Sequence, residues 1–589
     1  MSGAEVKFPI DLTKFKKLKL DPSNPKLTDE QRDLLKDNIL LLRDAIVLFT
    51  STGAARGVSG HTGGAYDTVP ELCILLSLFE ASDKYYPIVF DEAGHRVATQ
   101  YLLSALEGSL PAEHLLHYRE ANSKLPGHPE LGLTPGVKFS SGRLGHMWPL
   151  INGVALANRD KTVFCLGSDG SQQEGNDAEA ARLAVAQNLN VKIIIDDNDV
   201  TISGHPSEYL KGYDLQKTLA GHGLEVITVQ GEDIDALWGG FAKAITHDGP
   251  AAIVSKRIMA PGVPGIQGSP HGHDVIPVEG ALTYFKNRGY STEKYNAIES
   301  ILNIEPTSVP YLYVGSTRET GANRTVFGES VCRVLDGLSK EEAARTVMVI
   351  DSDLEGSTGL KIIHQKHPDV FVPSGIMERG NFSAAAGFGF EPDKFGMVIS
   401  EITMARLNNC NVLCHFSHSG VDEMADNTCH FGINSFFADN GLDDVQSWLY
   451  FPADALQMDA IVRRVPFLLK PNSNERLFDG GYEFVSGKDE VILEGKDGYV
   501  VSFGDMLYRS YDAVLRVRQE GLDVGIVNKP TLNLVDEQTI RKIGLSPFVL
   551  VVESLSRKTG LGSRFGTWLL ERRLMPKYSY MGTNKEGVY

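Results

Sequence analysis

One stretch of the chain, residues 162–204, limits its possible folds more than any other. The apolar runs TVFCLG and VKIIIDDN are typical of strands buried on both faces, and NDAEAARLAVAQNLN between them has a helical pattern. A strand, a helix and a second strand at this spacing predict a parallel βαβ unit. Both strands would then end at the same edge of one sheet.

The length of 589 residues is too great for a single hydrophobic core. Similar alternations of apolar runs and helical patterns recur near residues 347–451 and again from about residue 498. We therefore expect an α/β protein of three consecutive α/β domains with mainly parallel sheets. The expected domains are residues 1–290, 321–485 and 486–589, with residues 291–320 as a linker.

Charge and composition exclude some classes of partner and compartment. The net charge of −18 argues against nucleic acid or an anionic membrane as the main partner. The N-terminal sequence has no signal-peptide pattern, and no apolar run is long enough to suggest a membrane span. Most of the six cysteines lie in apolar runs, as reduced buried thiols do. These features predict a cytoplasmic protein.

Polar residues follow both strands of the βαβ unit. Asp169 comes directly after the first strand, beside Gly170, and Asn198 comes after the second, with Glu174 close by in the sequence. Since parallel strands bring their carboxyl ends to one edge, Asp169 and Asn198 should approach each other there. Carboxylate and amide oxygens suit Mg²⁺ or Ca²⁺, and a metal with so few protein ligands commonly completes its shell with phosphate oxygens. The pair predicts a metal–diphosphate site.

Motifs in the first region resemble those of the transketolase family, in the family's order. Four of them carry histidines: SGHTGG has His61, DEAGH has His95, PGHPE has His128 and QGSPHG has His271. SSGRLGHMWPLING resembles the loop that holds the pyrimidine of thiamine diphosphate, through Gly142 and Leu144. GSDGSQQEG and DDNDVTISG resemble the diphosphate segment. By the family pattern its metal ligands are Asp169, Asn198 and the carbonyl of Val200.

The resemblance continues through the second region. SDLEGS matches a segment near cofactor and substrate, through Asp353 and Ser357, and SGIMERGN matches the motif of the catalytic glutamate, Glu378. The expected substrate-binding residues of this half are Arg324, Ser357, His418, Asp426, His430 and Lys470. Lys470 stands where the family has arginine, and lysine lacks the planar fork that binds phosphate in a bidentate manner.

The resemblance implies a thiamine-diphosphate enzyme of carbohydrate metabolism, such as the pentose phosphate pathway. It would transfer a two-carbon ketol unit from a ketose phosphate to an aldose, with Mg²⁺ or Ca²⁺ holding the diphosphate. Glu378 would share a proton with the aminopyrimidine ring, and its apolar neighbours would favour the protonated acid. The implied roles in moving protons among sugar hydroxyls belong to His61, His95, His128, His271 and His430. A homodimer is also implied, with each site shared between two subunits.

Some positions differ from the family pattern and leave alternatives open. Ser168 and Thr62 replace a glycine and a proline, and Arg143, His146 and Met147 alter the pyrimidine loop. The region from Phe390 to Ile402 is short, and offers only Phe388, Phe390 and Phe395 as aromatic support for the pyrimidine. The alternatives are a deoxyxylulose-phosphate synthase, a ketoacid dehydrogenase component, or a catalytically impaired paralogue. A zinc site made by Cys410, Cys414 and Cys429 with neighbouring histidines is a further, weaker hypothesis.

Overall fold

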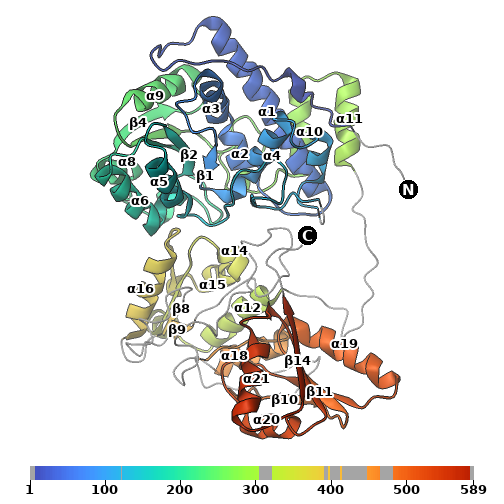
Figure 1. Ribbon diagram of the computed structural model, residues 1–589. Helices are drawn as coiled ribbons and strands as arrows, with labels where there is room; N and C mark the ends of the chain where they lie inside the picture. The colour runs from blue at the N-terminus through green and yellow to red at the C-terminus, as the bar shows by residue number, and fades with distance from the viewer. Residues whose placement is uncertain are drawn as a thin grey trace.

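The computed structural model describes residues 7–120, 123–303, 322–390, 395–397, 412–413, 448–464 and 482–583. Within them the chain forms three sheets with helices around each (Figure 1). We call residues 7–303 the N-terminal part, the described residues of 322–464 the middle part, and 482–583 the C-terminal part. The prediction of an α/β fold with mainly parallel sheets is confirmed.

The N-terminal part is built on a five-stranded sheet whose strand pairs are all parallel, in the order β1-β2-β3-β5-β4. The predicted strands of residues 162–167, 191–198 and 251–256 are present as β2, β3 and β5. The strands are β1 (Phe90–Asp91), β2 (Val163–Ser168), β3 (Val191–Asp197), β4 (Glu225–Gln230) and β5 (Ala251–Lys256).

Helices cover both faces of this sheet. Along β2, Phe164 and Leu166 point into one apolar core, whereas Val163 and Cys165 point into the other. This alternation explains why the strand sequences are apolar throughout. The helices are α1 (Asp29–Ala55), α2 (Gly63–Asp67), α3 (Val69–Ala81), α4 (Val97–Leu106), α5 (Met147–Ala157), α6 (Gly175–Ala186), α7 (Pro206–Tyr209), α8 (Leu215–Gly221), α9 (Ile234–Thr246), α10 (Val278–Asn287) and α11 (Thr292–Leu302).

Helix α1 begins with a capping box. The Gln31 amide donates to Thr28 Oγ1 at 3.2 Å, and the Thr28 amide donates to Gln31 Oε1 at 2.9 Å.

By length and composition, helix α1 could cross a membrane, whereas the sequence predicted no membrane-spanning segment. However, 78% of its most apolar window is buried inside the N-terminal part, as in the core helix of a folded domain.

The middle part contains a parallel sheet in the order β7-β6-β8-β9. Its strands are β6 (Val347–Ile350), β7 (Phe371–Val372), β8 (Phe395–Met397) and β9 (Val412–Leu413). Its helices are α12 (Asn323–Leu335), α13 (Lys340–Thr346), α14 (Glu355–Thr358), α15 (Leu360–Lys366), α16 (Glu378–Phe390) and α18 (Ala455–Arg464). The run VQSWLYF at residues 445–451 is typical of a strand, and the prediction of a strand there is wrong for the residues that the structure describes: over residues 448–451 only an isolated bridge forms, between Tyr450 and Thr531.

The C-terminal part has a five-stranded sheet in the order β10-β12-β11-β13-β14, in which only β10 runs antiparallel. The apolar runs YVVSFG, LDVGIVN and FVLVVES, typical of buried strands, form β11, β12 and β13. At the edges, β10 has an apolar run of only three residues, Val491–Leu493, and β14 has a mixed sequence. The strands are β10 (Glu490–Leu493), β11 (Gly498–Ser502), β12 (Val524–Asn528), β13 (Phe548–Ser556) and β14 (Lys577–Thr583). The helices are α19 (Asp505–Gln519), α20 (Glu537–Ile543) and α21 (Leu561–Glu571).

Candidate active site

The carboxyl-end edge of the N-terminal sheet gathers most of the predicted site residues. His95 follows β1, Asp169 follows β2 and Asn198 follows β3. Because β1, β2 and β3 pair in parallel, these three strands end side by side. The sheet register pairs Ser168 with Asp196, and the Asp169 amide donates to the Asp196 carbonyl at 3.1 Å.

The carboxylate of Asp169 is buried and is held by backbone amides. Its Oδ1 accepts from Gly170 N and its Oδ2 from Asp199 N, both at 2.8 Å. Burial, reinforced by the charges of Asp197 and Asp196, raises the pKa of Asp169 well above its usual range. A group of like charges in a buried place is a favourable position for a cation.

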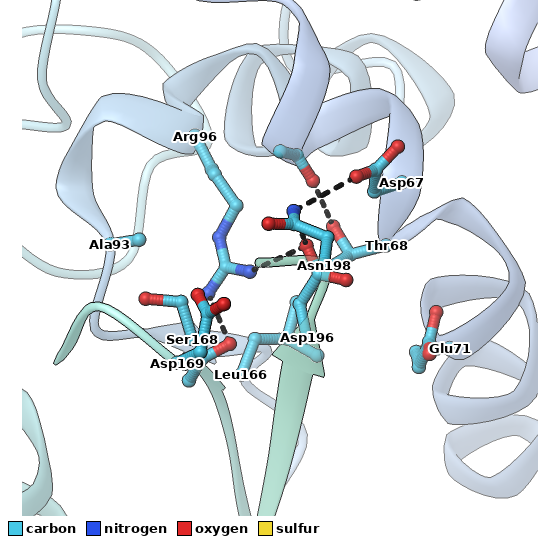
Figure 2. Close-up of polar contacts among 12 residues, drawn as sticks. Asp67, Thr68, Glu71, Ala93, Arg96, Leu166, Ser168, Asp169, Asp196 and Asn198 are labelled. Atoms are coloured by element: carbon cyan, nitrogen blue, oxygen red, sulfur yellow. Dashed lines mark hydrogen bonds and ion pairs between the residues drawn. The ribbon is translucent and has the colours of Figure 1, made fainter. Parts of the chain in front are cut away.

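The amide of Asn198 is held through both its nitrogen and its oxygen, and Figure 2 shows the contacts of the nitrogen. Its Nδ2 donates to Asp67 Oδ2 at 3.0 Å and to Asp196 Oδ2 at 3.1 Å. Its Oδ1 accepts from the Val200 amide at 3.0 Å. Asp169 and Asn198 are therefore brought together as the sequence predicted. The role of the Val200 carbonyl as a third ligand stays a prediction.

The donor set fits a divalent cation that binds oxygen. Among the described residues, no group of three or more histidine, cysteine, aspartate and glutamate side chains could hold a metal ion. A metal here would thus combine Asp169 with amide and carbonyl oxygens and with oxygens from a bound ligand, as Mg²⁺ does. The alternative zinc site, with Cys410, Cys414 and Cys429, lies outside the described residues.

Buried ion pairs support this edge from behind. Arg257 donates to Glu71 and to the Asp67 carbonyl, and its Nε lies 3.1 Å from Asp196 Oδ1. The last contact is an ion pair without hydrogen-bond alignment. Arg96 contacts Asp91 at 2.7 Å and donates to the Gly167 carbonyl at 3.0 Å. The positive charges of these two buried guanidinium groups therefore offset the negative charges of several buried carboxylates.

Three histidines form a compact cluster beside the edge. The ring centroids of His61, His95 and His273 lie 4.7–5.1 Å apart. Burial and neighbouring histidines lower the pKa of His95 well below its usual range, and they lower that of His273 to about 3. Neutral imidazoles each offer one donor and one acceptor nitrogen, which suits hydroxyl groups. His128 is also buried and close enough to affect the charge of His95.

The position of His271 differs from the expectation. His271 is exposed at a short 3-10 turn over Pro270–Gly272, whereas His273, two residues further on, joins the cluster. The turn begins with Ser269, whose side chain accepts from His271 N. The capped turn fixes the direction in which each histidine of this segment points. The sequence alone did not show that His273, rather than His271, would face inward.

The loop predicted to hold the pyrimidine packs between the histidines and Glu174. A Cβ atom at Gly94 would lie 2.6 Å from the Gly142 amide nitrogen, so Gly94 must lack one. Gly145 has a φ of 72°, and a Cβ there would lie 2.8 Å from Glu174 Cβ. Gly142 and Leu144 thus lie next to the residues expected around the cofactor.

The middle part contacts this edge within one chain. Asp353 Oδ1 accepts from Thr201 Oγ1 at 2.8 Å and from Ser203 N at 3.0 Å. The Ile376 amide donates to Gln173 Oε1 at 2.9 Å. Burial raises the pKa of Asp353 to about 6. These contacts bring Asp353 and the start of α16 to the residues that follow β2 and β3.

Glu174 and Glu378 form a carboxyl pair at the same place. Burial, the charge of Glu378 and a hydrogen bond with it raise the pKa of Glu174 to about 9. Behind them, burial raises the pKa of Glu92 to about 7 and that of Asp177 well above its usual range. Glu174 therefore holds a proton near neutral pH, next to the carboxyl group of Glu378.

The remaining predicted residues are spread out or not described. Arg324 is exposed in the first turn of α12, and Ser357 is half-buried in α14. His418, Asp426, His430 and Lys470 lie outside the described residues. Sequence reasoning missed Asp67, Asp196 and His273. For Asp196 the signal was available, since it directly precedes the predicted Asp197–Asn198 strand end.

This chain is similar in sequence to transketolases. The family model described as "Transketolase, thiamine diphosphate binding domain" matches residues 88–288, and that described as "Transketolase, C-terminal domain" matches residues 487–582. The chain is 30% identical to one subunit of the apulose-4-phosphate transketolase of Actinobacillus succinogenes over 273 residues, which cover 43% of this chain and 97% of that protein. It is 24% identical to the transketolase of Homo sapiens over 487 residues, covering 76% and 75% of the two chains. Among solved structures, transketolase from Campylobacter jejuni matches with a TM-score of 0.40 at 18% identity, over 93% of this chain and 95% of that one.

The carboxyl pair predicts a specific pH dependence. Glu174 has a folded pKa of about 9 against an ordinary value of 4.5. Its contribution to stability is fully present below the ordinary value and is lost as pH rises through the folded value. We expect the melting temperature of the ligand-free protein to fall across that range, and Glu174→Gln and Glu378→Gln each to weaken this fall.

Glu80→Gln is the control, because Glu80 is exposed and its pKa is lowered by Lys17. Melting curves measured by circular dichroism at several pH values test the prediction. Parallel profiles for wild type and Glu174→Gln would contradict it.

Proposed function

This chain belongs to the transketolase family of thiamine-diphosphate enzymes, and from that premise we propose that it is a ketol transferase. The proposed reaction moves a two-carbon unit from a ketose phosphate, such as xylulose 5-phosphate, to an aldose or aldose phosphate. One observation carries the proposal: the cluster of His61, His95 and His273 lies at the same sheet edge as Asp169 and Asn198. Closely spaced imidazoles, with the pKa values of His95 and His273 lowered, suit a substrate with several hydroxyl groups.

Asp169, Asn198 and the Val200 carbonyl would hold Mg²⁺ or Ca²⁺, and through it the diphosphate. The buried carboxylate of Asp169, next to the charges of Asp196 and Asp197, supports this assignment. When bound, thiamine diphosphate supplies the electron sink that makes cleavage of a carbon–carbon bond beside a carbonyl possible. Gly142 and Leu144 would bind the pyrimidine from the loop that packs on Gly94.

Glu378 would hold a proton at the aminopyrimidine. The neighbouring Glu174 supports this role, because burial and the charge of Glu378 raise the pKa of Glu174 to about 9, so that Glu174 holds a proton beside Glu378 at neutral pH. His61, His95, His273 and His128 would hold and move protons at the sugar hydroxyls. His418, Asp426 and His430 keep their proposed substrate roles by resemblance alone.

A homodimer is part of the proposal. Helices α5 and α6 expose apolar side chains, with Leu150, Leu156 and Leu183 40–48% exposed. A second copy could cover them. In this structure the hydrogen bonds of Asp353 and Gln173 join the middle part to the N-terminal part of the same chain. A homodimer would either keep these hydrogen bonds within each chain or form them between its two subunits. A cytoplasmic location stays a prediction, compatible with the free, buried thiols of Cys73, Cys165 and Cys332.

A coupled assay tests the reaction. The protein is supplied with xylulose 5-phosphate and ribose 5-phosphate, with and without thiamine diphosphate and Mg²⁺. Apulose 4-phosphate is tested as an alternative ketose, since a relative at 30% identity is named for it. We expect turnover that requires the cofactor. No turnover, together with no rise in melting temperature on adding cofactor and metal, would contradict the proposal. Decarboxylation of pyruvate instead would favour a different reaction in the family.

Glu378→Ala should abolish turnover while leaving diphosphate binding intact. Glu378 contacts the Glu174 side of the site, whereas the diphosphate is assigned to Asp169 and Asn198. Turnover is measured in the coupled assay and binding by the cofactor-dependent rise in melting temperature. A variant that stays fully active would contradict the role of Glu378.

His273→Ala should lower kcat/KM for the sugar substrates by about 100-fold or more, the scale of a lost acid–base group. His271→Ala is the matched control, because it lies two residues away and is exposed. Its kcat/KM should stay within about threefold of wild type, a change too small to indicate a catalytic contact. The opposite order of effects would return the role to His271.

A further inference from the structure

The amide of Asn198 has two possible orientations, and only one presents oxygen to a metal. Asn198 Nδ2 has two hydrogens, and it lies 3.0 Å from Asp67 Oδ2 and 3.1 Å from Asp196 Oδ2 (Figure 2). Nδ2 also lies 3.2 Å from Met259 Sδ, a weaker acceptor, so its two hydrogens face two carboxylate oxygens and a thioether sulfur. The opposite face of the amide, Oδ1, accepts from the Val200 amide.

The reverse orientation is strongly disfavoured. It would place Asn198 Oδ1 against two carboxylate oxygens and Asn198 Nδ2 against the Val200 N–H group. Three hydrogen bonds would be replaced by contacts between like groups. Asp67 cannot turn away to relieve them, because its Oδ1 accepts from the Ala260 amide at 2.8 Å and its carbonyl accepts from Arg257.

The retained orientation leaves Asn198 Oδ1 on the side of Asp169. The residue between Asn198 and Val200 is Asp199, whose amide donates to Asp169 Oδ2 at 2.8 Å. The oxygen of Asn198 and the carboxylate of Asp169 are thus bonded to consecutive backbone amides. This is the edge to which the metal was assigned.

We propose that Asp67, acting with Asp196, is a positioning residue that holds the Asn198 amide so that its oxygen faces the metal. The inference rests on the proposed function, since it assumes that Asn198 is a metal ligand. Asp67 acts through Asn198 and does not itself contact the metal. Outer-shell partners of this kind set the orientation of a ligand and thereby the affinity of the site.

The substitution Asp67→Asn tests the proposal with little change in volume. An asparagine has one acceptor oxygen, which can serve either Ala260 N or Asn198 Nδ2 but not both. With the oxygen on Ala260, two amide NH₂ groups would face each other, and the Asn198 amide would turn to relieve the clash. The matched control is Glu71→Gln. It also removes one buried charge beside Arg257, but no contact joins Glu71 to Asn198 among those the structure shows.

Mg²⁺ is titrated into the full-length protein at saturating thiamine diphosphate, with tryptophan fluorescence and melting temperature as readouts. The ligand-free melting temperature of each variant is measured beside them, because a merely structural role would move only that value. We expect Asp67→Asn to weaken Mg²⁺ binding by about 10- to 100-fold, and Glu71→Gln to keep the wild-type affinity within about threefold. Equal Mg²⁺ affinities in the two variants would overturn the proposal.

Two further experiments distinguish a wrong positioning role from misfolding of Asp67→Asn and from failure of the proposed function. If Asp67→Asn does not fold, the double variant Asp67→Asn/Asn198→Asp restores a donor facing an acceptor at this contact. It should bind Mg²⁺ more tightly than Asn198→Asp alone, and equal binding would overturn the proposal. If the wild type itself shows no response to Mg²⁺ and thiamine diphosphate, the proposed function fails first, and the positioning role fails with it.

Discussion

The site depends on the parallel pairing of β2 with β3. The register that sets Ser168 opposite Asp196 brings Asp169 and Asn198, which are far apart in sequence, to adjacent strand ends. The hydrogen bond from the Asp169 amide to the Asp196 carbonyl continues that pairing past the end of β2. A shift of one residue would turn Asp169 away from Asn198 and remove the place for a cation.

This register concentrates negative charge that the fold must offset. Asp67, Glu71, Asp91 and Asp196 are all buried, and Arg96 and Arg257 lie among them. Such a network contributes little net stability, because the desolvation of each ion opposes the attraction between them. Its effect is on orientation: each carboxylate and amide has one arrangement that satisfies its neighbours.

The sequence predicted those features that depend on local pattern. Continuous apolar runs identified β2, β3 and β5, and polar residues after them identified the site edge. Edge strands β10 and β14 were not predicted, because the apolar run of β10 is only three residues long and β14 alternates exposed with half-buried residues. His273 was missed because the Ser269 cap decides which histidine of the turn faces inward. Asp67 was missed because its function exists only through a contact 131 residues away in the chain, with Asn198. The pairing of Glu174 with Glu378 likewise joins two separate parts of the chain.

The short helix α2 connects the histidine cluster with the residues that hold the Asn198 amide. It spans only Gly63–Asp67; His61 lies just before its first residue, and Asp67 is its last. One end of the helix is therefore attached to the histidine cluster and the other to the amide of Asn198. A displacement of this short helix would therefore move both His61 and Asp67, and any coupling between ligands at its two ends would be reciprocal. If the proposed metal and sugar occupy these two ends, metal binding that shifts the helix would change the affinity for the sugar, and sugar binding would change the affinity for the metal by the same factor.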